Sequence, residues 1–417
     1  MQKIWVEGGK PLVGNINIHG AKNALLPILA ASLMINGISV VHNAPKLSDT
    51  NACLNILKAF GAKVKQEGNT LTLDTAGVKS ANITEDLTAT MRSSITFLGA
   101  ALSRFKKVNL AYPGGCKLGP RPIDIHIDAL EKLGVTFENS EDNIIAVGNL
   151  KGAKITFPVA SVGATENIIL AATLAKGETV LENAAKEPEI VDLANFLNSA
   201  GAKINGAGTS TIVISGVKNL HSTEYSTMPD RIAATTYLAA AAITRGDVTI
   251  NNISQDILSA SLNAFEKMGC DLYTKNNAIR LKNNSALKPL ANIKTGVYPG
   301  FATDVQPLFL ACTTLANGNS KFTETIFENR FSINDELVKF GAKVSTNAQT
   351  ATIKGVNFLS GAKVKAQDLR GAAALTIAAL AASGESTIYN PHFIDRGYEN
   401  FEENFKKLGA TIARLKR

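Results

Sequence analysis

One cysteine of this sequence lies in a loop whose composition favours chemistry. Cys116 stands among glycines and prolines in Tyr112-Pro-Gly-Gly-Cys-Lys-Leu-Gly-Pro-Arg-Pro-Ile-Asp124, with Lys117 and Arg121 close by. Neighbouring positive charge favours the thiolate and raises the reactivity of a cysteine. A glycine-rich loop with cations also has the composition of a lid that closes over an anionic ligand. A surface turn with an incidental thiol is the alternative.

The bulk composition is that of a soluble globular protein with two or three domains. The chain has 417 residues, of which 45% are hydrophobic and 19% charged, enough to fill more than one core. Its longer apolar runs, residues 238–243 and 372–382, are too short to span a bilayer. The N-terminus has no apolar core like that of a signal peptide. We therefore expect a cytoplasmic protein with no membrane segment.

The distribution of charged residues argues against a nucleic acid partner, and the spacing of cysteines and histidines argues against a metal site. The net charge is +8, yet the lysines and arginines are dispersed and few aromatic residues lie between them, so small charged anions fit better than nucleic acid. Cys53, Cys116, Cys270 and Cys312 show no pairing pattern, and the five histidines show no metal-ligand spacing. We expect no metal site and no nucleic acid partner, with Cys53 and Cys312 in the core.

A sixfold repeat organises the chain. A helix that ends in glycine plus a small residue recurs at spacings of 73, 67, 68, 72 and 68 residues. The six glycines are Gly61, Gly134, Gly201, Gly269, Gly341 and Gly409. Each lies where a helix C-cap needs left-handed backbone, and a strand-like run follows it. The sequence therefore predicts six copies of one unit.

Each unit is expected to begin with an apolar helix and a short strand, and to end with a second helix and further strands. The expected first helices span residues 24–34, 95–102, 168–175, 232–242, 307–316 and 372–382. The sixth unit keeps only residues 410–417 after its glycine, so strand-like residues 3–7 and 15–19 are expected to complete it. This predicts an α/β protein of two three-unit domains, residues 22–228 and residues 1–21 with 229–417.

Charged and polar residues recur at the expected starts of these helices. They are Lys22, Arg92, Thr165, Arg231, Asp304 and Arg370 for the first helices, and Lys46, Arg121, Lys186, Asp256, Arg330 and Arg396 for the second. A helix N-terminus attracts anions, so a cation placed there opposes the dipole and indicates an anion site. Solvated or structural roles stay open for Lys46, Lys186 and Arg231. Lys22, Arg121 and Arg396 are the candidates for function.

Two acidic residues are candidates for a general base. Asp304 precedes an expected helix, so helix capping is its alternative role. Asp368 lies two residues before Arg370, with which it can pair. A carboxylate near bound anions can accept the proton of a hydroxyl. Asp304 is the first choice and Asp368 the second, because the choice depends on distances.

Ten short motifs occur in register along the chain. They are His-Gly-Ala-Lys-Asn (19–23), Met-Arg-Ser-Ser (91–94), Pro-Gly-Gly-Cys with Gly-Pro-Arg-Pro-Ile-Asp (113–124), Ser-Val-Gly-Ala-Thr (161–165), Glu-Pro-Glu-Ile-Val-Asp (187–192), Pro-Asp-Arg-Ile (229–232), Thr-Asp-Val-Gln (303–306), Phe-Glu-Asn-Arg-Phe (327–331), Asp-Leu-Arg (368–370) and Asp-Arg-Gly-Tyr-Glu (395–399). Together they resemble the UDP-N-acetylglucosamine 1-carboxyvinyltransferase family over essentially the whole chain.

The resemblance implies a two-domain inside-out α/β barrel with mixed sheets, three βαβαββ units per domain and the active site in the interdomain cleft. It implies transfer of the enolpyruvyl group of phosphoenolpyruvate to the 3-hydroxyl of UDP-N-acetylglucosamine, with release of phosphate and without a cofactor. This is the first committed step of peptidoglycan synthesis, and hence part of cell-wall growth, cell shape and division.

The same resemblance implies the site residues. Phosphoenolpyruvate would contact Lys22, Asn23, Arg121, Arg370 and Arg396. UDP-N-acetylglucosamine would contact Asn23, Arg92, Arg121, Pro122, Ile123, Asp124, Ile125, Val159, Ala160, Ser161, Val162, Gly163, Asp304 and Ile326. Cys116, the lid cysteine, would donate a proton to the substrate. It would also add covalently to phosphoenolpyruvate and react with the epoxide fosfomycin.

The implied chemistry agrees with the residue types. Several cations must converge on phosphoenolpyruvate, a small polyanion. Its C3 needs an acid while the sugar hydroxyl needs a base, and a thiol is a reasonable acid. Two rivals stay open: enolpyruvylshikimate-phosphate synthase, whose family lacks the Pro-Gly-Gly-Cys and Ser-Val-Gly-Ala-Thr segments, and a non-catalytic UDP-sugar-binding protein on the same scaffold.

Overall fold

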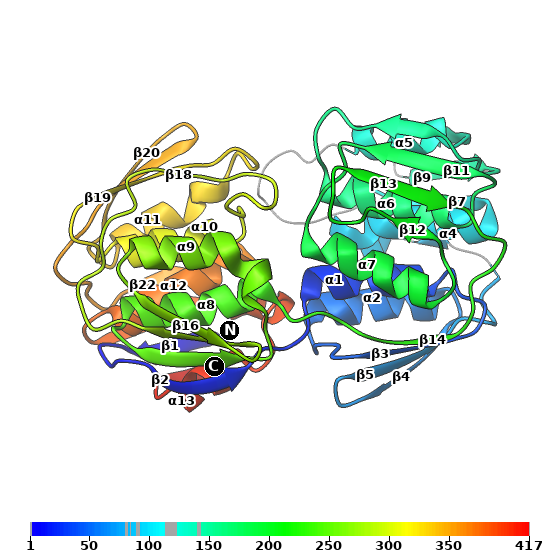
Figure 1. Ribbon diagram of the computed structural model, residues 1–417. Helices are drawn as coiled ribbons and strands as arrows, with labels where there is room; N and C mark the ends of the chain where they lie inside the picture. The colour runs from blue at the N-terminus through cyan, green and yellow to red at the C-terminus, as the bar shows by residue number, and fades with distance from the viewer. Residues whose placement is uncertain are drawn as a thin grey trace. The chain divides into compact units, whose positions relative to one another are not determined.

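The structure is a computed structural model that describes residues 2–79, 82–83, 85–88, 92–112, 123–139 and 143–416. These residues divide into two compact units (Figure 1). We call the described residues from 19 to 228 the central unit. Residues 2–18 and 229–416 form the terminal unit, which contains both chain ends. Within the described part of the chain, no helix is long and apolar enough to cross a membrane.

The sheets of the central unit share one plan. Each has four strands, of which one edge strand is parallel to its neighbour and the other pairs are antiparallel. The strand orders are β14-β3-β5-β4, β6-β7-β9-β8 and β10-β11-β13-β12. The strands are β3 (Ile38–His42), β4 (Lys63–Glu67), β5 (Thr70–Asp74), β6 (Asn82–Ile83), β7 (Lys107–Ala111), β8 (Val135–Asn139), β9 (Asn143–Gly148), β10 (Lys154–Thr156), β11 (Glu178–Glu182), β12 (Ile204–Asn205), β13 (Thr211–Ser215) and β14 (Thr223–Ser226).

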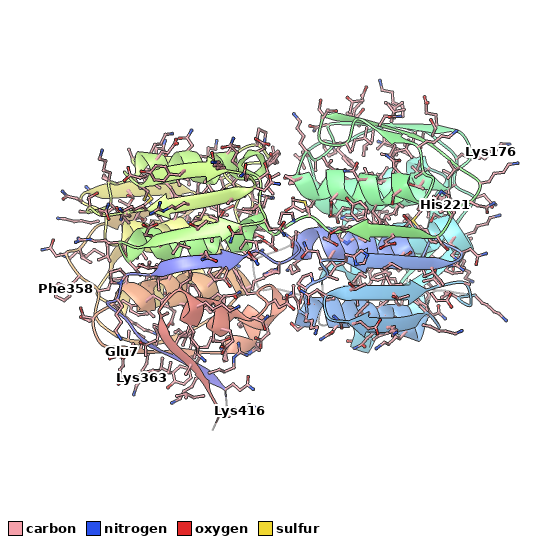
Figure 2. All side chains as sticks on the ribbon, turned by 60° about the horizontal axis from the view of Figure 1, so that its bottom comes forward. Glu7, Lys176, His221, Phe358, Lys363 and Lys416 are labelled. Carbon is pink, nitrogen blue, oxygen red and sulfur yellow. The ribbon has the colours of Figure 1, made fainter. Side chains whose placement is uncertain are left out.

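The terminal unit repeats this plan with strand orders β16-β17-β15-β2, β18-β19-β21-β20 and β22-β23-β1-β24. Its strands are β1 (Lys3–Glu7), β2 (Val13–Asn17), β15 (Asp247–Asn251), β16 (Asp271–Lys275), β17 (Ala278–Lys282), β18 (Ile293–Lys294), β19 (Asn319–Thr323), β20 (Lys343–Asn347), β21 (Thr350–Lys354), β22 (Lys363–Lys365), β23 (Glu385–Tyr389) and β24 (Thr411–Leu415). One face of each sheet is buried. Along β1, for example, Ile4 and Val6 are buried while Glu7 points outward (Figure 2).

The first helix of each repeat lies in the core of its unit. These helices are α1 (Lys22–Ser32), α4 (Thr96–Phe105) and α6 (Val162–Thr173) in the central unit, and α8 (Arg231–Ile243), α10 (Gln306–Thr313) and α12 (Leu369–Ala381) in the terminal unit. Within the terminal unit the three helices pack against one another, and α4 packs against α1 and α6 in the central unit. Their many alanines let neighbouring helices approach closely. The expected α/β fold with mixed sheets is confirmed.

The second helices end at the marker glycines. They are α2 (Ser48–Ala59), α5 (Asp124–Lys132), α7 (Pro188–Ser199), α9 (Ser259–Lys267), α11 (Asn334–Val338) and α13 (Phe401–Lys407). Shorter helical segments are α3 (Glu85–Thr88) and the 3-10 helices η1 (Arg92–Ile95), η2 (Gln255–Leu258), η3 (Arg330–Ile333) and η4 (Pro391–Arg396). All six marker glycines have φ between +88° and +98°. The expected left-handed C-caps are thus confirmed, and with them the repeat.

The two chain ends meet in one sheet. Strand β1 pairs antiparallel with both β23 and β24, which confirms that an N-terminal strand completes the sixth repeat. The second N-terminal strand differs from expectation in position and partner. It spans Val13–Asn17 rather than residues 15–19, and it pairs parallel to β15 of the fourth repeat. Likewise β14 pairs parallel to β3 and completes the first repeat.

Candidate active site

A lysine begins helix α1 in the central unit. The N-cap residue Ala21 offers no side chain to the free N–H groups, and Lys22 follows as the first helical residue. The Nζ atom of Lys22 lies 3.2 Å from Oδ2 of Asp49 in the first turn of α2. Both side chains are largely buried, at 12% and 6% exposed. Asp49 therefore holds the ammonium near a helix N-terminus, where an anion is also attracted.

The segment before α6 offers backbone donors. Ser161 caps the helix through its side chain, which accepts a hydrogen bond from the Ala164 nitrogen at 3.4 Å. Val159 and Val162 are exposed and Ala160 is half-buried. Gly163 lies against the His126 ring, since a Cβ there would be 3.2 Å from its Cε1 atom. An exposed helix start of this kind can receive a phosphate group.

Helix α6 begins earlier than the sequence indicated. It starts at Val162 rather than residue 168, so Thr165 is the fourth helical residue and not the first. The Thr165 hydroxyl accepts a hydrogen bond from the backbone nitrogen of Ala185. Thr165 is therefore a buried structural residue.

A buried glutamate on α6 gives the central unit a pH-dependent stability. Burial, and then the charges of Glu189 and Glu187, raise the pKa of Glu166 to about 8. Between about pH 4.5 and pH 8 the folded protein binds a proton here that the unfolded chain lacks, so this group lowers stability as pH rises through that window. Glu166→Gln is expected to stabilise the protein on the order of 3 kcal/mol at pH 8.5 and little at pH 5. Urea unfolding at both pH values measures this, with Glu178→Gln as an exposed control; equal gains at the two pH values would contradict the raised pKa.

The lid residues are only partly described. Cys116, Arg121 and Pro122 lie outside the described residues. Ile123 is the N-cap residue of α5, and Asp124 and Ile125 are its first two residues. Arg92 begins the 3-10 helix η1 that leads into α4.

The terminal unit brings two predicted arginines, Arg330 and Arg370, together around Asp304. Oδ1 of Asp304 accepts a hydrogen bond from Nη2 of Arg330 at 2.8 Å. Oδ2 accepts from Nε and Nη2 of Arg370 at 3.3 and 3.2 Å. Both arginine side chains are buried, at 1% and 3% exposed, whereas the Asp304 side chain is 29% exposed. Asp304 is therefore ion-paired on both oxygens and still reachable from solvent.

The environment of Asp368 is different. Its Oδ1 atom caps α12 by accepting hydrogen bonds from the backbone nitrogens of Arg370 and Gly371, at 2.9 and 3.0 Å. The side chain is 7% exposed, and Nη1 of Arg330 lies 3.9 Å away. The alternative role of Asp368, pairing with the Arg370 side chain, is not observed. The carboxylate binds the backbone of that residue instead. Asp368 is a helix cap in this structure, and Asp304 is not, since Val305 precedes α10.

Arg370 retains an unused donor. Burial lowers the pKa of its guanidinium, but the negative charges of Asp304 and Asp230, with the neighbouring Tyr398 hydroxyl, outweigh this and leave the pKa above its usual value. Its Nη1 atom is buried and makes no hydrogen bond within the described residues. A buried cationic donor without a partner is costly, and a bound anion would satisfy it.

Glu324 is a buried acidic residue beside Asp304 that no sequence pattern singled out. It is 1% exposed and accepts hydrogen bonds from the hydroxyls of Thr295 and Thr303, each at 3.0 Å. It also accepts from the backbone nitrogen of Ile326 at 2.8 Å. Glu324 thus fixes Thr303, next to Asp304, relative to Ile326. A charged residue at the end of a buried strand was the available signal, but its partners lie far apart in sequence.

Arg396 and Ile326 complete the predicted set. Arg396 was expected at the start of a second helix, but it is the last residue of η4, and α13 begins only at Phe401. This extra 3-10 segment begins at Pro391, and Gly397 follows its last residue. The second helix of the repeat therefore begins later in the chain than expected. Arg396 is half-buried. Ile326 is 42% exposed, and Asn23, the second residue of α1, is half-buried.

The fold and the family model define the class of this protein. The model described as EPSP synthase (3-phosphoshikimate 1-carboxyvinyltransferase) matches residues 6–405. The enolpyruvyl transferase NikO from Streptomyces tendae has a similar structure, with a TM-score of 0.90, 24% identity and coverage of 100% of this chain and 99% of the other. EPSP synthase from Acinetobacter baumannii gives a TM-score of 0.79, with 20% identity and full coverage of both chains. The chain belongs to this enolpyruvyl transferase family.

Curated relatives narrow the class. UDP-N-acetylglucosamine 1-carboxyvinyltransferase 2 of Caldanaerobacter subterraneus subsp. tengcongensis is 49% identical over 416 residues, covering 100% of both chains. UDP-N-acetylglucosamine 1-carboxyvinyltransferases of Geotalea uraniireducens and Geobacter metallireducens are 45% and 44% identical, again over the full length of both chains. Within the family, the chain therefore belongs with the UDP-N-acetylglucosamine 1-carboxyvinyltransferases, as the ten motifs indicate.

Proposed function

We propose that this protein transfers the enolpyruvyl group of phosphoenolpyruvate to the 3-hydroxyl of UDP-N-acetylglucosamine and releases phosphate. The observation that carries the proposal is the 44–49% identity, over the whole chain, to relatives with this name. The 20% identity to EPSP synthase supports a shared fold and no more.

Phosphoenolpyruvate is proposed to bind to cations from both the central and the terminal unit. Lys22, Asn23, Arg121 and Arg396 are its proposed ligands, together with the open Nη1 donor of Arg370. The ion pair of Lys22 with Asp49 supports this, since it keeps the ammonium in place before the substrate arrives. The interdomain cleft predicted from the sequence stays a prediction.

Asp304 is the proposed general base. It is more exposed than Asp368, 29% against 7%, and it caps no helix. A carboxylate oxygen that accepts one hydrogen bond keeps further acceptor capacity, so Asp304 can still receive the hydroxyl proton. Arg330 donates to Oδ1 of the Asp304 carboxylate, whereas Arg370 donates to Oδ2. Nη2 of Arg330 also donates to the Thr303 carbonyl at 2.9 Å. We assign Arg330 a positioning role.

The UDP moiety is proposed to lie at the start of α6. Residues 159–163 there combine exposed apolar side chains with the free N–H groups of a helix start, which suits a diphosphate. The remaining proposed contacts of UDP-N-acetylglucosamine are Asn23, Arg92, Arg121, Pro122, Ile123, Asp124 and Ile125, with Asp304 and Ile326 near the sugar.

The chemical steps follow from these roles. The sugar hydroxyl loses its proton to Asp304 and its oxygen attacks C2 of phosphoenolpyruvate, while Cys116 protonates C3. The tetrahedral intermediate then loses a proton from C3 as phosphate leaves, which restores the double bond. We place this reaction in the cytoplasm, at the first committed step of peptidoglycan synthesis, and we expect fosfomycin to alkylate Cys116.

A phosphate-release assay with two acceptors and a sample without acceptor tests the proposal. The protein is incubated with phosphoenolpyruvate and UDP-N-acetylglucosamine, shikimate 3-phosphate or no acceptor. Phosphate release is expected only when UDP-N-acetylglucosamine is the acceptor. Release with shikimate 3-phosphate would identify the rival synthase, and tight UDP-sugar binding without any release would identify a non-catalytic binding protein.

Lys22→Ala is expected to raise KM for phosphoenolpyruvate. A charge-assisted contact contributes about 1.5 to 3 kcal/mol, so the expected increase is roughly 10- to 100-fold, with a smaller change in KM for the UDP-sugar. Steady-state kinetics with each substrate varied measures both effects. Lys63→Ala, a change in an exposed lysine of the same unit, is the control, and equal kinetics of the two variants would contradict the anion-site assignment.

A further inference from the structure

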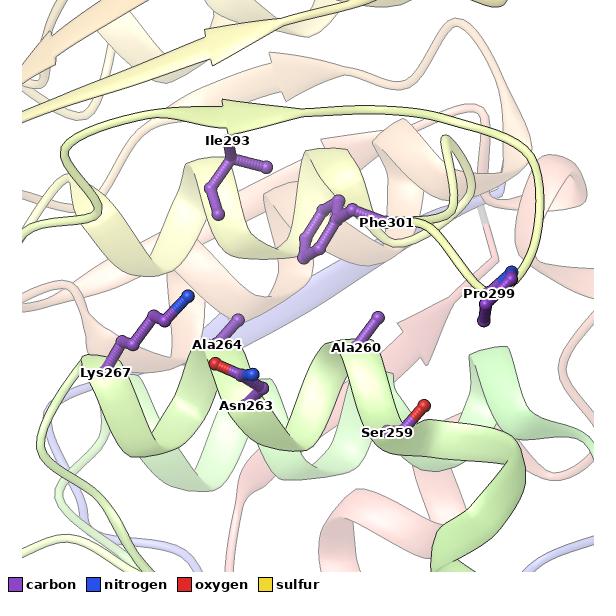
Figure 3. Close-up of a pocket in the computed structure, with 8 residues that line it drawn as sticks. All are labelled: Ser259, Ala260, Asn263, Ala264, Lys267, Ile293, Pro299 and Phe301. Atoms are coloured by element: carbon purple, nitrogen blue, oxygen red, sulfur yellow. The ribbon is translucent and has the colours of Figure 1, made fainter.

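A groove lies on the terminal unit, and none of its lining residues belongs to the proposed active site. It runs between α9 and the segment that leads from β18 to Phe301, and its volume is about 360 Å³ (Figure 3). Figure 3 shows the Phe301 ring opposite Ala260 and Ala264 of α9, with Ile293 beside it and Lys267 at one end. The groove belongs to one unit, and all its lining residues are described.

Two sister repeats fill the corresponding place with larger side chains. Ala264 lies five residues before the marker Gly269, and the corresponding residue of α7, before Gly201, is Phe196. The Phe196 ring packs edge-on against Tyr225 of β14, the strand equivalent to β18, with centroids 5.7 Å apart.

A polar residue one turn earlier in α7 adds a hydrogen bond to the contact with Tyr225. Asp192 lies nine residues before Gly201 and accepts a hydrogen bond from the Tyr225 hydroxyl at 2.6 Å, whereas α9 has Ala260 at this position. In α11 the residue that corresponds to Ala264 is Glu336, which accepts from the Lys365 nitrogen of β22 at 2.8 Å. Larger side chains thus bridge helix and strand in these two repeats, while two alanines leave the space open in the fourth.

The lining of the groove is mixed. Ser259, Asn263 and Lys267 of α9 are polar, and Lys267 gives the groove one cationic end. Phe301 is 9% exposed and Ile293 is half-buried, so both offer apolar surface to a ligand. Lys267 and Asn263 lie one turn apart on α9 and supply an ammonium and an amide. Lys267 makes no ion pair within the described residues, so its charge is open to an anion.

We propose that this groove binds a small aromatic carboxylate, with the ring against Phe301 and Ile293 and the carboxylate on Lys267. A concave site that combines apolar side chains with a few polar groups is typical of small-molecule binding, and the cationic end selects an acid over its neutral amide. The segment from Phe301 continues to Ala302, Thr303 and Asp304, so the ligand contacts the chain segment that carries the proposed base. The proposal stands independently of the catalytic reaction.

Methyl NMR on the full chain tests this, with phenylacetate as the probe and phenylacetamide as its neutral match. In protein labelled at isoleucine and alanine methyl groups, phenylacetate is expected to shift Ile293 and Ala264 saturably, with Kd on the order of 1 mM for so small a ligand. Phenylacetamide is expected to bind roughly tenfold more weakly. Lys267→Gln should remove the preference for the acid and keep the weaker binding.

A second experiment fills the groove with a larger side chain. Ala264→Phe, which introduces the residue type of Phe196, is expected to abolish the Ile293 shift for both probes; Ala264→Met serves the same purpose if the phenylalanine variant does not fold. Absence of a saturable Ile293 shift, equal affinity for acid and amide, or shifts confined to Ile326 of the proposed active site would overturn the proposal.

Discussion

Asp304→Asn is expected to lower kcat about 10² to 10⁴-fold, the usual contribution of a positioned general base. The asparagine side chain keeps a carbonyl oxygen for Arg330 or Arg370, but it cannot take the proton of the sugar hydroxyl. KM for the UDP-sugar should change less than kcat, because the lost interaction belongs to the reaction step. The two buried arginines lose a counter-charge, so a lower unfolding temperature is also expected.

Asp368→Asn is the matched control for this change. Asparagine caps helices about as well as aspartate, so the variant should preserve the two hydrogen bonds to the start of α12. It is expected to keep kcat within about tenfold of the wild-type value, since a structural cap takes no part in proton transfer. A larger loss of kcat in Asp368→Asn than in Asp304→Asn would reverse the assignment of the base.

Cys116→Ala is expected to reduce turnover about 10² to 10⁴-fold without changing the fold, because the variant lacks the proposed acid. Cys116→Asp should recover much of the turnover, since a carboxyl group can also donate a proton, and it should no longer react with fosfomycin. Stopped-flow or coupled phosphate release measures turnover, and circular dichroism checks the fold. Full-rate turnover of Cys116→Ala would exclude the proton-donor role.

The other cysteines make Cys116 a selective chemical target. The thiols of Cys53, Cys270 and Cys312 are buried. Burial raises the pKa of the Cys270 thiol to about 12 and those of Cys53 and Cys312 well above their usual value, so none of the three is reactive at neutral pH. Cys270→Ala is a suitable control, since four of the sister repeats have alanine after the marker glycine. Its turnover should match the wild-type rate.

Much of the fold was predictable from local patterns. The six glycines need left-handed backbone, a property of the residue itself, and all six adopt it. Strand β1 was predicted at its observed bounds because residues 3–7 resemble the strand-like runs that precede the other first helices. Strand β2 was placed two residues late, because its register is set by pairing with β15 more than 230 residues away. Such pairing leaves little trace in a short polar strand.

The candidate site was predictable in residue types but not in partnerships. The sequence marked Asp304, Asp368 and Arg370 as charged residues near helix starts. It did not indicate that Arg370 binds Asp304 with its side chain and Asp368 with its backbone. Arg396 was predicted at the start of a helix. It is instead the last residue of the 3-10 segment Pro391–Arg396, which precedes the helix. These distinctions depend on tertiary contacts.

The product of the reaction tests the central claim most directly. Incubation of the protein with phosphoenolpyruvate and UDP-N-acetylglucosamine should yield one phosphate per acceptor consumed. The acceptor should gain an enolpyruvyl ether at the 3-oxygen, visible by mass spectrometry and as vinyl protons by NMR. Phosphate release with an unmodified acceptor, or attachment at another hydroxyl, would contradict the proposed transfer.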